Sequence, residues 1–114
     1  MKIYFKRKPL DVKVKKVSSF GKFIGLMFKS AKSENLLFEF DYPGRIRIHS
    51  YFVFFKFTAV WLDKKNNVLE AEIVEPFRLN VRPKKPVHKL VEIPLNKKNL
   101  NLVRILVEGE RFKY

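Results

Sequence analysis

Alternation of apolar and polar side chains with a period of two runs along most of this chain and predicts β-strands. The pattern is clear at residues 36–41, where Leu36, Phe38 and Phe40 share one face, and at residues 87–93, which Pro94 ends. We expect Pro9 to end the first strand, because proline cannot donate to a ladder. The predicted strands cover residues 2–6, 12–15, 36–41, 45–49, 51–62, 69–73, 87–93, 103–107 and 112–114.

The stretch from Tyr51 to Leu62 is apolar on both of its faces, apart from Lys56, and therefore predicts a strand in the centre of a sheet. Residues 42–44 and 63–67 have the polar, Pro and Gly composition of turns and predict two hairpins. Residues 75–86 contain three prolines and predict an irregular crossing.

One segment departs from the strand period. At residues 18–30, apolar side chains recur at the spacing of a helical stripe, and Ser18 or Ser19 can cap the start. A short helical turn is also expected at residues 96–101. The fold class predicted is all-β, a mainly antiparallel sandwich or barrel, with one short α-helix near residues 18–30. With 114 residues, we expect one domain spanning residues 1–114.

The charge is uneven along the chain. Lys and Arg exceed Asp and Glu by ten to two in residues 1–35 and by nine to three in residues 81–114, while residues 36–80 hold six of each. These differences, +8, +6 and 0, give the net charge of +14. If the two basic ends meet in the fold, they form one patch that would attract a polyanion, such as nucleic acid. The alternative is a solubilising Lys-rich coat of the kind found in hyperthermophile proteins.

The chemistry-bearing motifs of common enzymes are missing. There is no cysteine, no phosphate-cradling glycine loop and no nucleophile elbow, so no cofactor and no metal are predicted. No apolar run is long enough to span a membrane and no secretory signal starts the chain, so a cytoplasmic location is the expectation. We therefore expect a non-enzymatic binding or accessory module of unknown ligand, present as a monomer or weak homo-oligomer.

Candidate binding residues lie at the open end of the predicted sheet: His49, Lys56 and Thr58. Two other functions stay open. A small enzyme or sugar-binding module would use the barrel mouth, with His49 near one of Glu39, Glu70 or Glu72. Nonspecific binding of nucleic acid would need a continuous basic face with exposed aromatic side chains. The candidates for these are Tyr4, Tyr51 and Tyr114.

Several segments, in order over about residues 10–113, resemble the family called domain of unknown function 192. The first is the structural motif Gly25-Leu26-Met27-Phe28. The others are Asn35–Phe40, His49–Thr58, Trp61-Leu62-Asp63 followed by Asn67-Val68, His88–Pro94 and Gly109-Glu110. The resemblance implies a small β-rich domain with one helix and no established reaction. This chain also departs from the family pattern, because the family's Pro-Leu-Asp stands here as Lys56-Phe57-Thr58. Thr58 takes the place of the acid, and Lys56 reverses the local charge.

Overall fold

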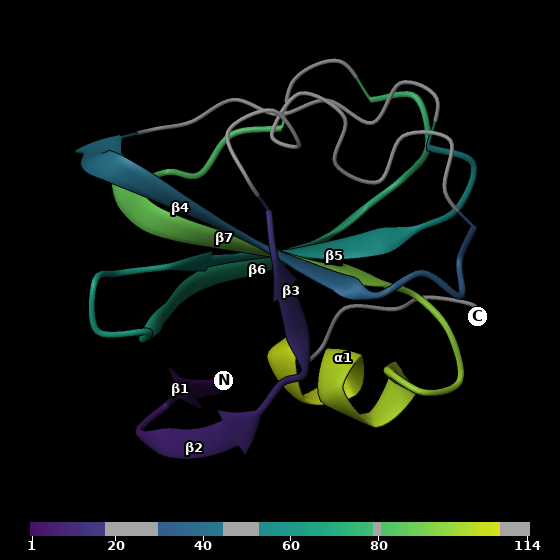
Figure 1. Cartoon of the computed structure of the whole chain (residues 1–114), viewed down its shortest axis with the longest axis horizontal. Coiled ribbons are helices and arrows are strands. Elements are labelled where there is room, and N and C mark those ends of the chain that lie inside the picture. The colour runs from purple at the N-terminus through teal and green to yellow at the C-terminus, as the bar shows by residue number, and fades with distance from the viewer. Residues whose placement is uncertain (18–29, 45–52, 79–80, 108–114) are drawn as a thin grey trace.

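A computed structural model describes residues 1–17, 30–44, 53–78 and 81–107 (Figure 1). The helix predicted near residues 18–30, with the motif Gly25–Phe28, lies outside the described residues, apart from Ser30. The strands predicted at 45–49 and 112–114 also lie outside them.

The core of the fold is a five-stranded sheet with the order β3-β4-β7-β5-β6. The β3–β4 pair is parallel and the other pairs are antiparallel. The predicted all-β class with one short helix is confirmed. The described sheet is open and does not close into a barrel, and a separate hairpin accompanies it. The five strands are β3 (Val14–Lys16), β4 (Asn35–Gly44), β5 (Phe57–Leu62), β6 (Val68–Val74) and β7 (Val87–Pro94).

Both faces of the sheet are covered, which explains the apolar character of both faces of β5. Val60 and Leu62 face a cluster that includes Val103 and Leu106, whereas Phe57 and Trp61 belong to the opposite cluster. All six residues of β5 are buried. Fully burying a large apolar side chain stabilises the fold by about 1.5–3 kcal/mol, so these two clusters dominate the stability.

Strand β5 is shorter than the pattern predicts. Residues 51–62 were expected as one strand, but β5 begins at Phe57 and residues 53–56 are not in a strand. The pairing explains the difference, because Phe57 is opposite Val74 in β6 and opposite Pro94 in β7, the last residue of each partner. Beyond this row β6 offers no further ladder, and the β7 side adds one backbone bond, from the N–H of Leu95 to the carbonyl of Lys56 at 3.0 Å. Apolar content alone therefore does not extend the strand.

A separate hairpin formed by β1 (Lys2–Phe5) and β2 (Lys8–Asp11) makes a second, two-stranded sheet. The expectation that Pro9 ends the first strand is wrong, because the chain already turns at Lys6 and Arg7 and Pro9 pairs with Tyr4 inside β2. A two-stranded sheet has only edge strands, where the missing N–H of proline is tolerated.

The described helix, α1 (Leu100–Leu106), replaces the strand predicted at residues 103–107. It lies on the same side of the sheet as the β1–β2 hairpin (Figure 1). Val103, Leu106 and Val107 follow the helical spacing i, i+3, i+4 and pack in the cluster that also holds Ile3 and Val12 of the hairpin region. The helix and the hairpin therefore share one face of the sheet. No helix among the described residues has the length and apolar character needed to cross a membrane.

Candidate functional site

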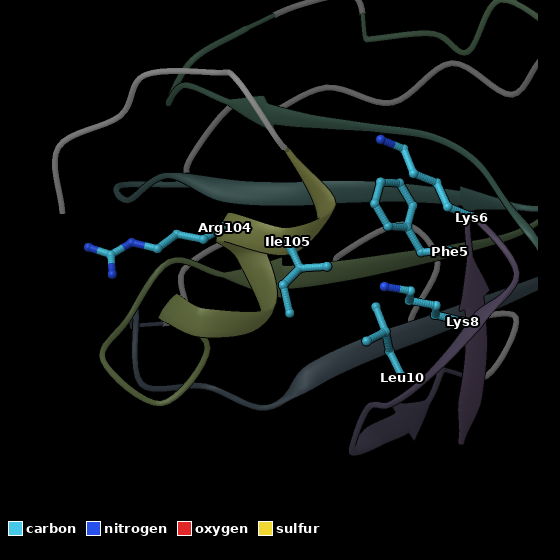
Figure 2. A pocket seen from close by; sticks show the side chains of 6 residues that line it. All are labelled: Phe5, Lys6, Lys8, Leu10, Arg104 and Ile105. Carbon is cyan, nitrogen blue, oxygen red and sulfur yellow. The ribbon is translucent and has the colours of Figure 1, made fainter.

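A groove of about 480 Å³ opens where the hairpin meets α1 (Figure 2). Phe5 and Leu10 come from the hairpin and Ile105 from the helix, and their apolar side chains face the groove. Lys6 and Lys8 stand beside this apolar surface, and Arg104 lines it from the helix, with its guanidinium extending outward. The volume lies in the range of small-molecule sites, about 300–1,000 Å³.

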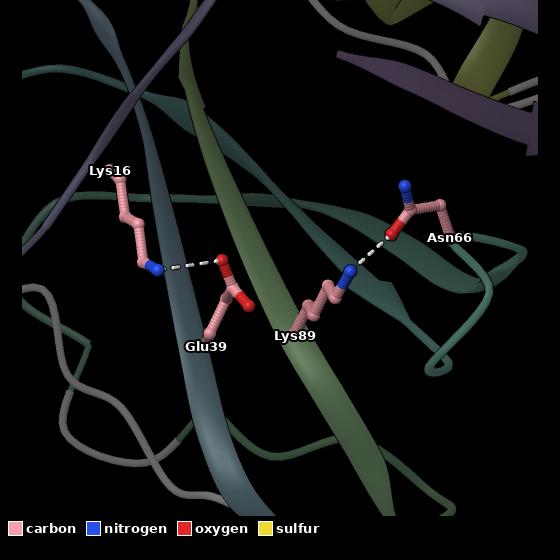
Figure 3. Close-up of polar contacts among 4 residues, drawn as sticks. All are labelled: Lys16, Glu39, Asn66 and Lys89. Atoms are coloured by element: carbon pink, nitrogen blue, oxygen red, sulfur yellow. Dashed lines mark hydrogen bonds and ion pairs between the residues drawn. The ribbon is translucent and has the colours of Figure 1, made fainter.

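The basic ends of the chain meet at this groove, because Lys6 and Lys8 come from the N-terminal third and Arg104 from the C-terminal third. Two cations on the sheet are held by nearby partners. Lys16 pairs with Glu39 at 3.3 Å, and Lys89 donates to Asn66 at 2.7 Å (Figure 3). Within the described ranges, neither Lys8 nor Arg104 forms an ion pair, so both are available to an anion.

The turn that carries one of these cations has an unusual backbone. Lys6 and Arg7 have φ angles of 51° and 68°, the left-handed region that two-residue hairpin turns normally fill with Asn-Gly or Gly. Non-glycine residues in this region cost about 1–2 kcal/mol each. The Lys6 ammonium also lies 5.3 Å from the centre of the Phe5 ring, the range of a cation–π contact. The turn thus holds one cation, Lys6, at the groove at a cost in stability.

The structure separates the three residues predicted as binding candidates. His49 lies outside the described residues. Lys56 has a side chain that is 33% exposed and pairs with Glu75 at 3.6 Å, so its charge reaches solvent and meets an acid. Thr58 is fully buried, on the side of β5 that carries Val60 and Leu62. Lys56 and Thr58 line neither of the two grooves described for this chain.

Replacing Thr58 by valine is expected to raise the free energy of unfolding by about 1–2 kcal/mol, because burying an unbonded hydroxyl is costly. Among the described residues the Thr58 hydroxyl has no hydrogen-bond partner, and valine matches the shape of threonine. Urea denaturation would measure the change, with Thr58→Ser as the control that keeps the hydroxyl and loses the methyl. A less stable Thr58→Val protein would show that the hydroxyl makes a bond that folding or binding uses.

The carboxylates considered for an enzyme have structural partners. Glu39 pairs with Lys16, and Glu72 pairs with Arg78 at 3.9 Å. Glu70 accepts a hydrogen bond from the backbone N–H of Lys84, which ties the crossing at residues 75–86 to β6. None of the three lines either groove, and no metal-binding cluster of three or more His, Cys, Asp or Glu occurs among the residues described.

Sequence reasoning missed a buried acid, Glu92, in the central strand β7. It lies in one row with Leu36, Ala59 and Glu72 on the face opposite α1. Burial raises the pKa of Glu92 to about 8, so the carboxyl is mostly protonated at neutral pH. Its Oε1 atom and the Nε1 atom of Trp61, another residue facing this side, have no hydrogen-bond partner in the part of the chain that the structure describes. The available signal was its position between buried neighbours in a strand that is covered on both faces.

A second groove, of about 450 Å³, lies beside the start of β4 and the segment before α1. Its three asparagine side chains bind one another or the backbone. Asn99 donates to the Asn35 side chain at 3.1 Å and to the Pro94 carbonyl at 2.8 Å, and Asn96 donates to the Ala31 carbonyl at 2.7 Å. These bonds hold the approach to α1 against the sheet, so the amides act as structural ties.

The groove residues Arg104 and Ile105 were also missed from sequence, because the segment at 103–107 was predicted as a strand. In a strand, the side chains of Arg104 and Ile105 would point to opposite faces of the sheet. In α1 both are exposed, and both line the groove next to the hairpin.

An open five-stranded sheet that carries a helix and a hairpin on one face, with a groove between them, defines a small β-rich domain. The chain belongs to the DUF192 family, described as an uncharacterized ACR family, whose model matches residues 4–103. No curated protein matches the chain at a significant level.

Two solved structures share this fold. One is a protein of unknown function from Novosphingobium aromaticivorans DSM 12444, with a TM-score of 0.73 and 13% identity over 89% of this chain and 75% of that chain. The other is a candidate transcription regulator from Sinorhizobium meliloti 1021, with a TM-score of 0.69 and 15% identity over 82% of this chain and 77% of that chain. Identities this low show a common fold and nothing about activity.

Proposed function

We propose that this protein is a non-enzymatic binding module whose groove between the β1–β2 hairpin and α1 takes a small anionic amphiphile. Such a ligand carries an acidic head and a short apolar chain. The observation that carries the proposal is the combination of Lys6, Lys8 and Arg104 with an apolar surface of Phe5, Leu10 and Ile105 in one groove.

Each half of the groove favours one half of the ligand. Ile105 is 45% exposed, and covering such surface contributes roughly 25 cal/mol per Å² of apolar area. The ammonium groups of Lys6 and Lys8 lie close to the apolar side chains (Figure 2), so a ligand whose chain packs there has its acidic head within reach of them. The strained backbone of the Lys6–Arg7 turn supports a role in binding, because such strain is often retained at ligand sites.

The test uses octanoate as the probe and NMR chemical shifts of the full chain as the readout. Octanoate is expected to shift the amides of the groove residues to saturation, whereas acetate and 1-octanol, which supply the head or the chain alone, bind at least about tenfold more weakly. Lys8→Glu is expected to weaken octanoate binding by about tenfold, because a charge reversal removes one attraction and adds a repulsion. Ile105→Ser is expected to weaken octanoate binding and leave acetate unaffected.

Lys2→Glu is the matched control, since it changes the net charge equally from an exposed position on the same hairpin that does not line the groove. Equal losses in Lys8→Glu and Lys2→Glu would mean that octanoate senses only the overall charge, and the groove would not be the site. Octanoate shifts spread over the whole basic surface would lead to the same conclusion.

A nucleic-acid partner is the outcome that would replace this proposal. Titration with single-stranded RNA at two salt concentrations separates the cases, because binding through charge alone weakens steeply with salt. Tight binding at physiological salt, with shifts over both basic ends of the chain, would favour nucleic acid. Binding that is seen only at low salt would leave the amphiphile site as the specific one.

A further inference from the structure

Two phenylalanines form an exposed aromatic pair at one end of the β5–β6 hairpin. Phe54 precedes β5 and Phe77 follows β6, and their rings meet edge to face with centroids 5.4 Å apart. Phe54 is 61% exposed and Phe77 is 50% exposed. Two large apolar side chains that contact each other on the surface are typical of the anchors of protein–protein interfaces.

The backbone places Phe77 in this exposed position against its own preference. Its φ angle is 62°, and it follows Pro76, which is the pattern of a type II turn, where glycine or asparagine normally occupies the second central position. For a bulky side chain this conformation is a genuine outlier. Such strain often marks a functional contact.

The surroundings of the pair are electrically balanced. The charged residues that flank the pair, two cations and two acids, sum to zero in a chain of +14. The two cations nearest in sequence to the pair are matched by acids, Lys56 by Glu75 at 3.6 Å and Arg78 by Glu72 at 3.9 Å. A polyanion would therefore find little attraction here and would favour the basic groove instead.

We propose that the aromatic pair of Phe54 and Phe77 is the centre of a weak, two-fold symmetric dimer interface between two copies of this chain. In a two-fold contact the same surface meets itself, so each side must complement its own charges. Alternating ion pairs satisfy this condition, since each cation can also face an acid of the second copy. Aromatic centres within a polar rim are the usual anatomy of such contacts.

Salt distinguishes this contact from the amphiphile site. Two chains of +14 repel one another, and raising the salt from about 0.1 M to about 1 M shortens the Debye length from about 10 Å to about 3 Å. Dimer formation through a neutral apolar surface therefore strengthens with salt, whereas binding of an anion to the groove weakens. The two proposals can fail independently, because their residues are separate.

Sedimentation equilibrium of the full chain tests the interface. At high salt, the average mass of the wild-type protein is expected to rise with concentration from that of one 13.6 kDa chain toward twice that value. Phe77→Asn is expected to remain a monomer at the same concentrations, and its folding is preserved because asparagine tolerates a positive φ. Phe54→Ser gives the same result at a site without backbone strain.

Tyr4→Ser is the matched control, because Tyr4 is another exposed aromatic residue, 38% accessible, outside both the groove and the aromatic pair. It is expected to dimerise like the wild type. A wild-type chain that stays monomeric at the highest soluble concentration in high salt would overturn the proposal. So would a Phe77→Asn protein that dimerises as strongly as the wild type.

Discussion

Replacing Glu92 by glutamine is expected to remove most of the pH dependence of stability between about pH 4.5 and about pH 8. Burial raises the pKa of Glu92 from 4.5 to about 8 in the folded protein. The folded chain then holds this proton more firmly than the unfolded chain does, so the free energy of unfolding falls as the pH rises through this window. This is the reverse of a carboxylate that is stabilised by partners, whose contribution is lost on acidification.

The expected size of this effect is on the order of 5 kcal/mol, because the pKa rises from 4.5 to about 8 and each pKa unit corresponds to about 1.4 kcal/mol. Glutamine keeps the shape of the side chain and has no charge to bury. Urea denaturation of both proteins at several pH values between these limits would measure the two slopes. The wild type should lose stability as the pH rises, and Glu92→Gln should not.

Glu72→Gln is the control for the Glu92 experiment. Glu72 lies in the same row on the same face, two strands away, with a side chain that is 38% exposed and paired with Arg78. It should keep the wild-type pH profile. If Glu92→Gln retained the wild-type slope, then Glu92 would be ionised in the folded state with a partner or solvent around it, and the burial argument would be wrong.

Replacing Ile3 by alanine is expected to lower the free energy of unfolding by about 2–5 kcal/mol, the usual cost of removing a large core side chain. Ile3 is fully buried and belongs to the cluster that includes Val103 and Leu106 of α1. The loss should fall mainly on the hairpin, since a two-stranded hairpin alone is marginally stable in water. The groove should lose octanoate binding with it, because β1 and β2 form one wall.

Hydrogen–deuterium exchange separates this local effect from general destabilisation. Amides of β1 and β2 in Ile3→Ala should exchange much faster, while those of the central strand β7 keep most of their protection. Ile3→Val, expected to cost about 0.5–1.5 kcal/mol, is the graded control. Equal acceleration in the hairpin and in β7 would show that the hairpin unfolds only together with the whole sheet.

The period of two in the sequence determined most of the sheet. Leu36 and Phe38 alternate with Leu37 between the two clusters, as their positions predict, and the turn at residues 63–67 connects β5 to β6. Pro94 ends β7 where a missing donor would interrupt a ladder. These features depend on neighbours in sequence and on the alternation of faces, so they can be derived without the fold.

Only the tertiary structure decided the state of residues 100–107. Val103, Ile105 and Val107 fit a strand, whereas Val103, Leu106 and Val107 fit a helix, and β-branched side chains favour the strand. A strand needs the hydrogen bonds of a sheet edge, while a helix satisfies its own backbone and needs only an apolar surface to cover. The sheet face beside Ile3 and Val12 supplies that surface, and α1 covers it.

The candidate site also depends on long-range packing. The sequence alone showed that both ends are basic and that the middle is neutral. It could not show that the hairpin and Arg104 line one groove, because about a hundred residues separate Lys8 from Arg104 and only the shared core places β1 near α1. Local patterns determine strands and turns in this protein, whereas the burial of Glu92 and the groove follow from which faces the folded sheet covers.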